Sequence, residues 1–575
     1  MMTRFVIHRI VLFIAIGLLV FGMSRPPEHE SQWLICLWLA SIPIAILGLG
    51  EIPLLLRVND TQRSLQSLTI IIAIGFGMLS LQLLRNQVIW SKYLANLVVV
   101  NQSTGETASN VRTLMVTSRT FRGAISDRNN TVLVESIVRP DGRTTRRYLT
   151  DNPSAFTPLL GVVNARYGVS GLEASYAEYL TGDRNVIGRF VRMLNSQPTK
   201  GDNLELTIDS ALQQKVAAIL AGHVGAGIVL DPSTGAVLAM VSAPSYNPND
   251  LTSNLDSDPF TDQTRMDAAW QRLLDPANNQ PLLNRAIQGR YPPGSTFKLV
   301  TAAIALENAG VARPDEITCP EQLTVEPGAP PVVNAVHNLK RLTGDPASLR
   351  TVIGFSCNTA FAQYALRLGV FRMLAGAEKF GLAVPDKSGE AITMTDLPTL
   401  ASLMYNNDNF LARLPGLADT GYGQGELLVT PLQMAMVAAT IGNNGVMMRP
   451  YIVERVVRAN GTEMYKHTNF PVGRSISSHS ALILRDAMRF AVTDGFGKAA
   501  QAVEGVAVGG KSGTAENGGP FTHAWFVALA PIENPRFAVA VLIENGGEGS
   551  RIGASLAGQI LRAAFSDIPL ASPKP

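Results

Sequence analysis

The sequence predicts an α+β fold, in which one antiparallel sheet is packed by helices and is preceded by a small mixed domain and by apolar helices. Three observations carry this prediction. Strand-like segments stand near both ends of the region after residue 203, and helical stretches fill its middle. The first 85 residues contain three long apolar segments. Strands at both ends with helices between them are typical of an α+β arrangement.

The apolar segments lie near residues 5–23, 33–56 and 67–84. Each is long enough to cross a bilayer, which requires about 20 apolar residues. The first could serve as a signal peptide, but Phe21-Gly-Met-Ser24 is a poor cleavage site and further apolar segments follow it. We therefore expect residues 1–85 to form a membrane anchor of about three transmembrane helices.

Positively charged residues indicate the orientation of this anchor. Arg4 and Arg9 precede the first apolar segment. Arg57 and Arg63 lie between the second and third, whereas the first connection carries only Arg25. Because loops rich in Lys and Arg stay in the cytoplasm, the pattern favours a cytoplasmic N-terminus. Three crossings then place the rest of the chain on the extracytoplasmic side, as a multi-pass protein of the cell membrane.

Residues 86–203 form the second predicted domain, a small mixed pedestal with no catalytic pattern. Within it, residues 121–130 are typical of a turn between two strands. The third predicted domain spans residues 204–575 and begins with the alternating strand pattern of residues 204–208. Residues 250–282 are rich in Asp, Asn and Pro, so we expect a long surface insertion there.

Local signals predict several elements of the third domain. Ser210 and Gln213 have the spacing of a capping box, which predicts a helix start at Ser210. Asp231-Pro-Ser-Thr-Gly235 joins two strand-like runs, and its turn chemistry predicts a β-hairpin. Near the C-terminus, residues 536–543 are typical of a strand and residues 552–565 of a helix.

Composition excludes several classes of function. The net charge of +3 over 575 residues is too small to indicate nucleic-acid binding. The seven histidines and three cysteines show no spacing typical of a metal site, so we expect neither a metal nor another cofactor. With 46% hydrophobic and 16% charged residues, the chain can form large buried cores in more than one domain.

The first of three chemical motifs is Ser295-Thr-Phe-Lys298, an S-x-x-K string. It follows Pro292-Pro-Gly294 and opens an apolar run, so Ser295 is expected to cap a helix. Lys298 then lies on the same helix face, where its amine can reach the serine hydroxyl. That amine can accept a proton only if its pKa falls well below about 10.4, which burial and a nearby cation such as Lys511 would achieve.

The second motif, Ser356-Cys-Asn358, precedes a helical stretch and is expected in a loop or a first helical turn. The Ser356 hydroxyl could relay a proton from Lys298 to a leaving amine, and the Asn358 amide could hold a peptide bond. Alone, the string is as readily an ordinary helix cap. The order of the three motifs makes the set specific.

The third motif is Lys511-Ser-Gly-Thr514, which we expect on a strand. Gly513 has no Cβ, so the backbone of a ligand could approach closely and add as a further strand. The lysine, with Ser512 and Thr514, would then bind a carboxylate of that ligand. The overlapping string Gly505–Ser512 matches the P-loop pattern, but the sequence after it cannot open a long helix, which argues against nucleotide binding.

Cys319 and Cys357 are the only cysteines outside the predicted anchor, since Cys36 lies in its second apolar segment. An oxidising location permits a disulfide between them. Such a bond would tie the loop that bears Ser356 to the segment around residue 319. Two buried thiols are the alternative.

The three motifs resemble those of the class B penicillin-binding proteins, the monofunctional transpeptidases of bacterial cell-wall synthesis. The resemblance covers about residues 115–565 and implies the penicillin-binding transpeptidase fold. The short pedestal is most similar to compact actinobacterial-type members, whereas three N-terminal spans depart from the single span usual in the family. Further strings similar to family motifs are Arg122-Gly-x-Ile-x-Asp127, Gly171-Leu-Glu173, Asp231-Pro-x-Thr-Gly235 and Gly423-Gln-Gly425-x-x-x-x-Thr430-Pro-Leu-Gln433.

The resemblance implies acyl transfer through a serine acyl-enzyme, formed from a stem peptide that ends in D-Ala-D-Ala. It implies that Ser295 is the nucleophile, Lys298 the base and Ser356 the proton relay. Asn358 would clamp the substrate, and Lys511-Ser-Gly-Thr514 would hold its carboxylate. The backbone N–H groups of Ser295 and Thr514 would form the oxyanion hole. No cofactor is implied.

The implied partners are peptidoglycan stem peptides with their lipid-linked precursor, β-lactams bound covalently at Ser295, and a SEDS-type glycosyltransferase in the membrane. Two other readings stay open: a hydrolase of the DD-carboxypeptidase or β-lactamase type, and a non-catalytic β-lactam sensor or scaffold. Between Ser356 and Lys511 no E-x-x-L-N-like string supplies a glutamate to activate water. This absence favours the transpeptidase over the β-lactamase.

Overall fold

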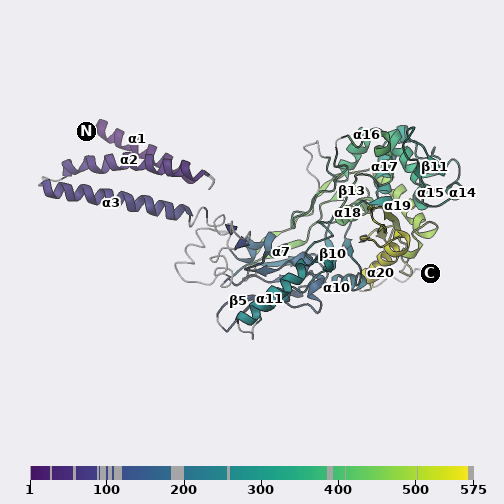
Figure 1. Ribbon diagram of the computed structural model, residues 1–575, viewed down its shortest axis with the longest axis horizontal. Coiled ribbons are helices and arrows are strands. Elements are labelled where there is room, and N and C mark those ends of the chain that lie inside the picture. Colours follow the sequence, from purple (N-terminus) through teal and green to yellow (C-terminus); the bar gives the residue numbers. More distant parts are fainter. Residues whose placement is uncertain are drawn as a thin grey trace. The chain divides into compact units, whose positions relative to one another are not determined.

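The computed structural model describes residues 2–25, 29–55, 60–86, 90, 99–100, 107–108, 120–140, 142–182, 200–254, 259–384, 393–407, 409–501 and 503–566. The chain divides into two compact units, Met1–Thr117 and Ser118–Pro575 (Figure 1). The predicted division into an anchor of residues 1–85, a pedestal of residues 86–203 and a catalytic domain of residues 204–575 stays a prediction.

The first unit contains three long helices that coincide with the predicted apolar segments: α1 (Met2–Met23), α2 (Glu30–Leu55) and α3 (Asp60–Leu84). Helix α2 packs against α1 and α3, with Trp33 buried, while large apolar side chains such as Phe13 and Phe76 are exposed. Counting only the residues that the structure describes, none of these helices combines the length and apolarity required of a membrane span. Two short strands pair antiparallel after α3, β1 (Val99–Val100) and β2 (Thr107–Ala108).

A six-stranded sheet in the second unit has the order β15-β14-β8-β3-β4-β5. Its strands are β3 (Ile125–Ser126), β4 (Val132–Val138), β5 (Thr144–Tyr148), β8 (Asn203–Leu206), β14 (Val453–Val457) and β15 (Glu463–Lys466). The predicted turn of residues 121–130 is confirmed only at its end: residues 127–131 join β3 to β4, whereas β3 itself lies within the predicted range. The predicted boundary between residues 203 and 204 falls inside β8, and the sheet continues into β14 and β15.

Two buried arginines hold a helical segment beside this sheet. Arg122 Nε donates to Glu173 Oε2 (2.8 Å) and Arg146 Nε donates to Glu173 Oε1 (2.7 Å). Because a buried carboxylate is costly unless it is paired, these bonds fix the position of α7 (Gly171–Ser175). Short elements complete the region: α6 (Thr157–Leu160), β6 (Val163–Asn164), β7 (Gly168–Val169) and α8 (Ala177–Leu180).

A second sheet of this unit has five antiparallel strands in the order β10-β9-β19-β18-β17. They are β9 (Gly225–Leu230), β10 (Val237–Ala243), β17 (Gly509–Ala515), β18 (His523–Ala530) and β19 (Phe537–Ile543). Val539 and Val541 on one face pack with α10 (Ser210–Ile219) and α20 (Ala554–Phe565). Ala538 and Ala540 on the other face belong to the core that contains α18 (Pro431–Gly442) and α19 (Ser478–Thr493). The predicted antiparallel sheet packed by helices is confirmed, as is the β9–β10 hairpin.

The helical part of the unit lies between β10 and β17 and carries the first two motifs. Helices α12 (Lys298–Glu307) and α16 (Asn358–Lys379) pack against each other, and each begins at a motif residue. The remaining helices are α11 (Pro259–Leu274), α13 (Ala309–Ala312), α14 (Leu339–Thr343), α15 (Leu349–Gly354) and α17 (Leu414–Gly421). Short strand pairs are formed by β11 (Gln322–Leu323) with β12 (Val332–Val333) and by β13 (Val446–Met448) with β16 (Pro471–Arg474).

One local prediction in this unit was wrong, and a second left out a helix. Helix α10 is capped by Asp209, whose carboxylate accepts the N–H of Leu212 (3.0 Å), so the cap lies one residue before Ser210. Gln213 closes no capping box, because its amide is hydrogen-bonded to distant backbone groups instead. Residues 250–282, for which only a surface insertion was predicted, contain the 16-residue helix α11.

Candidate active site

The first motif lies in a tight turn that leads into a helix. Gly294–Phe297 form the 3-10 turn η6, and α12 begins at Lys298. The expectation that Ser295 caps the helix was wrong, because Phe297 occupies the N-cap position of α12 and makes no side-chain cap. Among the residues that the structure describes, the Ser295 hydroxyl has no hydrogen-bond partner. This partly exposed hydroxyl is therefore free to react.

The amine of Lys298 is fully buried and contacts the second motif. Its Nζ donates to the main-chain oxygen of Ser356 (2.8 Å), to Ser356 Oγ (3.1 Å) and to Asn358 Oδ1 (2.6 Å). Burial, and secondarily the charge of Lys511, lowers the pKa of Lys298 well below that of an ordinary lysine. A shift in this direction favours the neutral amine that a general base requires.

Lys511 reaches the same hydroxyl from strand β17. Its Nζ donates to Ser356 Oγ (3.0 Å) and to the main-chain oxygen of Ser512 (2.8 Å). Burial lowers the pKa of Lys511 to about 7. Ser356 Oγ thus lies within hydrogen-bond distance of two lysine nitrogens. The expected combination of burial and a neighbouring cation is present around Lys298.

The backbone of Ser356 is in the left-handed region, with φ 56°, which is uncommon for a residue other than glycine. Helix α16 begins two residues later at Asn358, so the motif occupies a loop and a first helical turn as predicted. Between them, Cys357 forms a disulfide with Cys319, so the structure adopts the disulfide rather than two thiols. A left-handed backbone like that of Ser356 persists where the surroundings restrain it, and residues in this conformation cluster at functional sites.

Asn334 completes this loop, and no sequence pattern indicated its role. Its Oδ1 accepts the N–H groups of Asn358 (2.8 Å) and Thr359 (3.2 Å), so it caps α16 from 24 residues upstream. No spacing rule identifies a cap at that distance. Asn358, the predicted substrate clamp, uses both ends of its amide inside the protein, because Oδ1 accepts from Lys298 and Nδ2 donates to the Val333 oxygen (2.8 Å).

The η6 turn and strand β17 approach closely at two glycines. A Cβ on Gly513 would lie 2.8 Å from the oxygen of Pro293 and 2.9 Å from Thr296 Cγ2. A Cβ on Gly294, whose φ is +53°, would lie 2.7 Å from the oxygen of Thr514. The space beside Gly513 is therefore filled by the η6 turn, rather than left open for a ligand as the sequence suggested. Both glycines allow this turn to rest directly on the strand.

Strand β17 stands at the edge of the sheet, paired with β18 on one side and with no other described strand on its second side. Such an edge offers backbone N–H and C=O groups to an extended ligand. Thr514 is the exposed residue of this strand, and its Oγ1 accepts the N–H of Gly549 (3.2 Å). Lys511 and Ser512 are buried, so Thr514 is the predicted carboxylate ligand that solvent reaches.

The P-loop pattern and the metal ligands lead to no site. Gly510 and Lys511 lie inside β17, which continues to Ala515, whereas a P-loop opens a helix. In the part of the chain that the structure describes, no group of three or more His, Cys, Asp or Glu side chains is placed to hold a metal ion. His523 is the first residue of β18, and its ring packs edge-on against Tyr291 at 5.5 Å.

These residues together form a set suited to acyl transfer. The η6 turn supplies a hydroxyl with no partner among the described residues, α12 a buried lysine with a lowered pKa, and the loop before α16 a second hydroxyl. The edge strand adds a second buried lysine, and no further described strand pairs with its outer side. A serine hydroxyl becomes a nucleophile when a positioned base removes its proton, and the arrangement contains both groups.

Two protein-family models match this chain. The penicillin binding protein transpeptidase domain matches residues 225–565, which contain all three motifs. The penicillin binding protein A dimerisation domain matches residues 122–204, which contain the Arg122–Glu173–Arg146 cluster.

Named relatives and solved structures agree with these matches. The peptidoglycan D,D-transpeptidase PbpA of Mycolicibacterium smegmatis is 36% identical over 454 residues, which cover 75% of this chain and 85% of the relative. The imipenem acyl-enzyme complex of penicillin-binding protein A from Mycobacterium tuberculosis superimposes with a TM-score of 0.67 at 33% identity, covering 79% of this chain and 100% of that one. The D,D-transpeptidase domain of a peptidoglycan glycosyltransferase from Eggerthella lenta gives a TM-score of 0.64 at 32% identity, with coverages of 78% and 98%.

Proposed function

This chain belongs to the class B penicillin-binding proteins, and from that membership we propose that it is a serine-type D,D-transpeptidase of peptidoglycan. It cross-links stem peptides that end in D-Ala-D-Ala, and β-lactams inhibit it by acylating Ser295. The observation that carries the proposal is the position of Ser356 Oγ, which lies 3.1 Å from Lys298 Nζ and 3.0 Å from Lys511 Nζ.

In the acylation step, Ser295 Oγ attacks the penultimate carbonyl carbon of the donor stem peptide. Neutral Lys298 takes the hydroxyl proton, a role supported by its burial and lowered pKa. The C–N bond to the last D-Ala then breaks, and Ser356 passes the proton from Lys298 to the leaving amine. The donor peptide remains on Ser295 as an ester.

In the second step, the amine of a neighbouring stem peptide attacks this ester. Its proton passes through Ser356 to Lys298, and Ser295 regains a proton as its C–O bond to the acyl group breaks. A new amide joins the two peptides. Water in place of the amine gives hydrolysis instead, which would make the enzyme a carboxypeptidase or, with a β-lactam, a β-lactamase.

The donor peptide lies along β17 as an added strand, which the free edge of the sheet supports. Ser512 and Thr514 hold its carboxylate by their hydroxyls, and Lys511 supplies positive charge. The N–H groups of Ser295 and Thr514 stabilise the oxyanion, where loss of one donor costs roughly 100- to 1000-fold in rate. Asn358 clamps the substrate by exchanging its bond with the Val333 oxygen for a bond to a substrate carbonyl.

We further propose that residues 1–85 anchor the enzyme in the cell membrane, with a pedestal at residues 86–203 and the transpeptidase domain at residues 204–575 outside. Three helices with exposed apolar side chains support the anchor. A SEDS-type glycosyltransferase is the proposed membrane partner. Retention of the chain in the membrane pellet after alkaline carbonate extraction supports the anchor, and release into the supernatant contradicts it.

Two measurements test the proposed function. Intact-protein mass spectrometry after a fluorescent penicillin, with peptide mapping and washout, should find a stable adduct on Ser295. An adduct lost within seconds indicates a hydrolase. A stable adduct without cross-linked product from a stem-peptide donor and an amine acceptor indicates a sensor or scaffold, so the product assay separates this outcome from the transpeptidase.

A further inference from the structure

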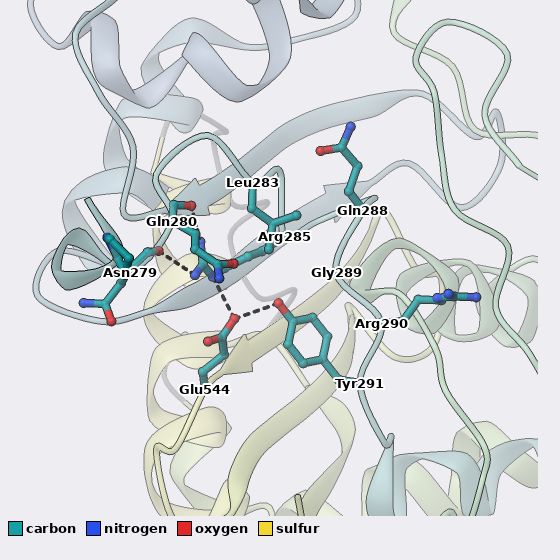
Figure 2. A pocket seen from close by; sticks show the side chains of 10 residues that line it. Asn279, Gln280, Leu283, Arg285, Gln288, Gly289, Arg290, Tyr291 and Glu544 are labelled. Carbon is teal, nitrogen blue, oxygen red and sulfur yellow. Dashed lines mark hydrogen bonds and ion pairs between the residues drawn. The ribbon is translucent and has the colours of Figure 1, made fainter. Parts of the chain in front are cut away.

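Glu544 directly follows strand β19 and lies between Arg285 and Tyr291 (Figure 2). Its Oε1 accepts hydrogen bonds from the Tyr291 hydroxyl (2.7 Å) and from Arg285 Nε (2.7 Å). The side chain of Arg285 is 3% exposed and that of Glu544 is 21% exposed. Bonds between charged groups that are largely shielded from water are strong and define a geometry.

Arg285 cannot move freely with its partner, because its other nitrogens are also engaged. They donate to the main-chain oxygens of Gln280 (3.1 Å) and Asn279 (2.7 Å). Both of these residues have left-handed backbones, with φ values of 50° and 54°. Such conformations are uncommon outside glycine and depend on surrounding contacts. Arg285 is therefore a fixed support for the Glu544 carboxylate.

On one side, Glu544 connects through Tyr291 to the η6 turn, since Tyr291 stands four residues before Ser295. The main chain of Tyr291 exchanges two hydrogen bonds with Val429, each 2.9 Å long. The oxygen of Pro292 accepts from Trp525 Nε1 (2.9 Å). Because these bonds leave the short segment little freedom, a displacement of Tyr291 passes on to Ser295.

On the other side, the main chain after Glu544 leads to strand β17. The loop of residues 544–549 ends at Gly549, whose N–H donates to Thr514 Oγ1 (3.2 Å). A Cβ on Gly549 would lie 2.0 Å from the oxygen of Gly513, so the loop rests directly on the strand. Within the loop, the N–H of Asn545 donates to His523 Nδ1 (3.1 Å) at the start of β18.

We propose that Glu544 is a positioning residue of the acylation step, which holds the Ser295 hydroxyl in register with strand β17 through Tyr291 and the 544–549 loop. The inference rests on the proposed transpeptidase function. Glu544 touches no reacting atom in this arrangement. Misplacement of reacting groups by about 1 Å can cost roughly 100-fold in rate, so loss of its carboxylate slows acylation.

A cavity of about 420 Å³ opens beside this cluster and reaches Glu544; its lining includes Leu283, Gln288 and Arg290. In Figure 2 the side chain of Arg290 points away from Glu544, so it is no substitute partner for the carboxylate. A small anion from solvent can enter a space of this size. The cavity therefore permits a rescue experiment.

The test compares full-length wild type with Glu544→Gln, Tyr291→Phe and Glu533→Gln, the last a glutamate that is 58% exposed before β19. Stopped-flow acylation by a fluorescent penicillin separates the affinity of the non-covalent complex from the acylation rate constant. Glu544→Gln and Tyr291→Phe should each lower the rate constant by about 10- to 100-fold, with affinity changed less than about twofold. Glu533→Gln should match wild type.

Tyr291→Phe keeps the Arg285–Glu544 pair, so it reports on the proposal even if Glu544→Gln fails to fold. Acetate should partly restore acylation by Glu544→Ala, whereas chloride at equal ionic strength should not. Wild-type rate constants in both Glu544→Gln and Tyr291→Phe overturn the inference, as does a loss that only follows the unfolded fraction. Absence of acylation in wild type would instead overturn the proposed function.

Discussion

Lys511 Nζ lies 3.0 Å from Ser356 Oγ, and this contact joins the edge strand of the sheet to the loop before α16. Lys298 Nζ approaches the same oxygen to 3.1 Å. A hydroxyl can accept from one amine while donating to another, so Ser356 can carry a proton whichever lysine is neutral. The contact also ties the pKa of Lys298 to the charge of Lys511.

Replacing Ser295 by alanine should abolish covalent labelling by penicillin, because the residue bears the proposed nucleophile. The fold should persist, since the hydroxyl has no partner among the described residues and alanine leaves the packing of η6 unchanged. Mass spectrometry and circular dichroism check the two parts. Ser233→Ala, at an exposed serine of the β9–β10 hairpin, should label normally. Stoichiometric labelling of Ser295→Ala would mean that another residue is the nucleophile.

The pH dependence of acylation should move when Lys511 is replaced by alanine. Lys298 must be neutral to act, so the rate rises with pH until the pKa of Lys298 is passed. The Lys511 charge lowers that pKa, so removing the charge should shift the rising limb to higher pH. In wild type, the acylation rate should fall again as Lys511 loses its proton above its pKa of about 7. Lys511→Ala should lack this fall.

Pre-steady-state acylation rates between pH 5 and 10 would measure both limbs. Exposed Lys498 supplies the control, because Lys498→Ala removes a positive charge that belongs to none of the three motifs and should leave the profile unchanged. If the rising limb stays at the same pH in Lys511→Ala, the charge of Lys511 does not lower the pKa of Lys298, and the prediction is contradicted.

Asn334→Ala should destabilise the protein by about 0.5–2 kcal/mol, the usual cost of losing a helix cap. It should also slow acylation, because the N–H groups of Asn358 and Thr359 lose their acceptor beside Ser356. Urea unfolding and acylation kinetics check the two effects. Asn334→Asp keeps an acceptor oxygen and should retain most of both properties. Equal stability of the alanine and aspartate variants would contradict the capping role.

Gly513→Ala should impair acylation, because its Cβ meets the Pro293 oxygen at 2.8 Å and the η6 turn must move. Overpacking of this kind costs about 1–3 kcal/mol in stability. Gly473→Ala, in strand β16, is the matched control, because a Cβ there meets nothing within 4 Å. Thermal unfolding and acylation assays should find Gly513→Ala less stable and slower than Gly473→Ala. Equal stability and rate in the two variants would show that the η6 turn can shift at little cost.

The Cys319–Cys357 disulfide closes a loop with a sequence separation of 38 residues. The double variant Cys319→Ser with Cys357→Ser should lose about 2–4 kcal/mol of stability, the usual effect of opening such a loop. Non-reducing peptide mapping should recover the linked peptides from wild type. Free thiols at both positions would contradict the pairing, and Cys36→Ser serves as a control that removes no crosslink.

The chemistry of the site was predictable because each motif is local. Ser295 and Lys298 share one turn, and Lys511 to Thr514 share one strand, so spacing alone indicated the elements that carry them. Contacts between distant segments could not be predicted in this way. Asn334 bonds to Asn358, 24 residues later in the chain, and Glu544 bonds to Arg285, more than 250 residues earlier. Neither residue lies in a recognisable sequence pattern.

The wrong local predictions have a common cause. Ser210 and Ser295 have the residue type of a helix cap, but tertiary contacts use them otherwise: Asp209 caps α10, and Ser295 enters a 3-10 turn pressed against β17. In residues 250–282, the many polar residues hid a helix that buries Met266 and Ala269. The pairing of β8 with β14 joins segments about 250 residues apart, which the alternating pattern of residues 204–208 could not reveal.

The free edge of β17 also limits how resistance to an inhibitor can arise. A backbone C=O survives every substitution and a backbone N–H every substitution except proline, so a drug that pairs with this edge exposes few contacts to mutation. Gly294 and Gly513 narrow the choice further, because any added side chain there meets backbone or a neighbouring residue. Under the proposed pairing of the donor peptide with β17, a substitution that moves the strand away from such a drug also displaces the natural peptide, so resistance by this route would slow cross-linking.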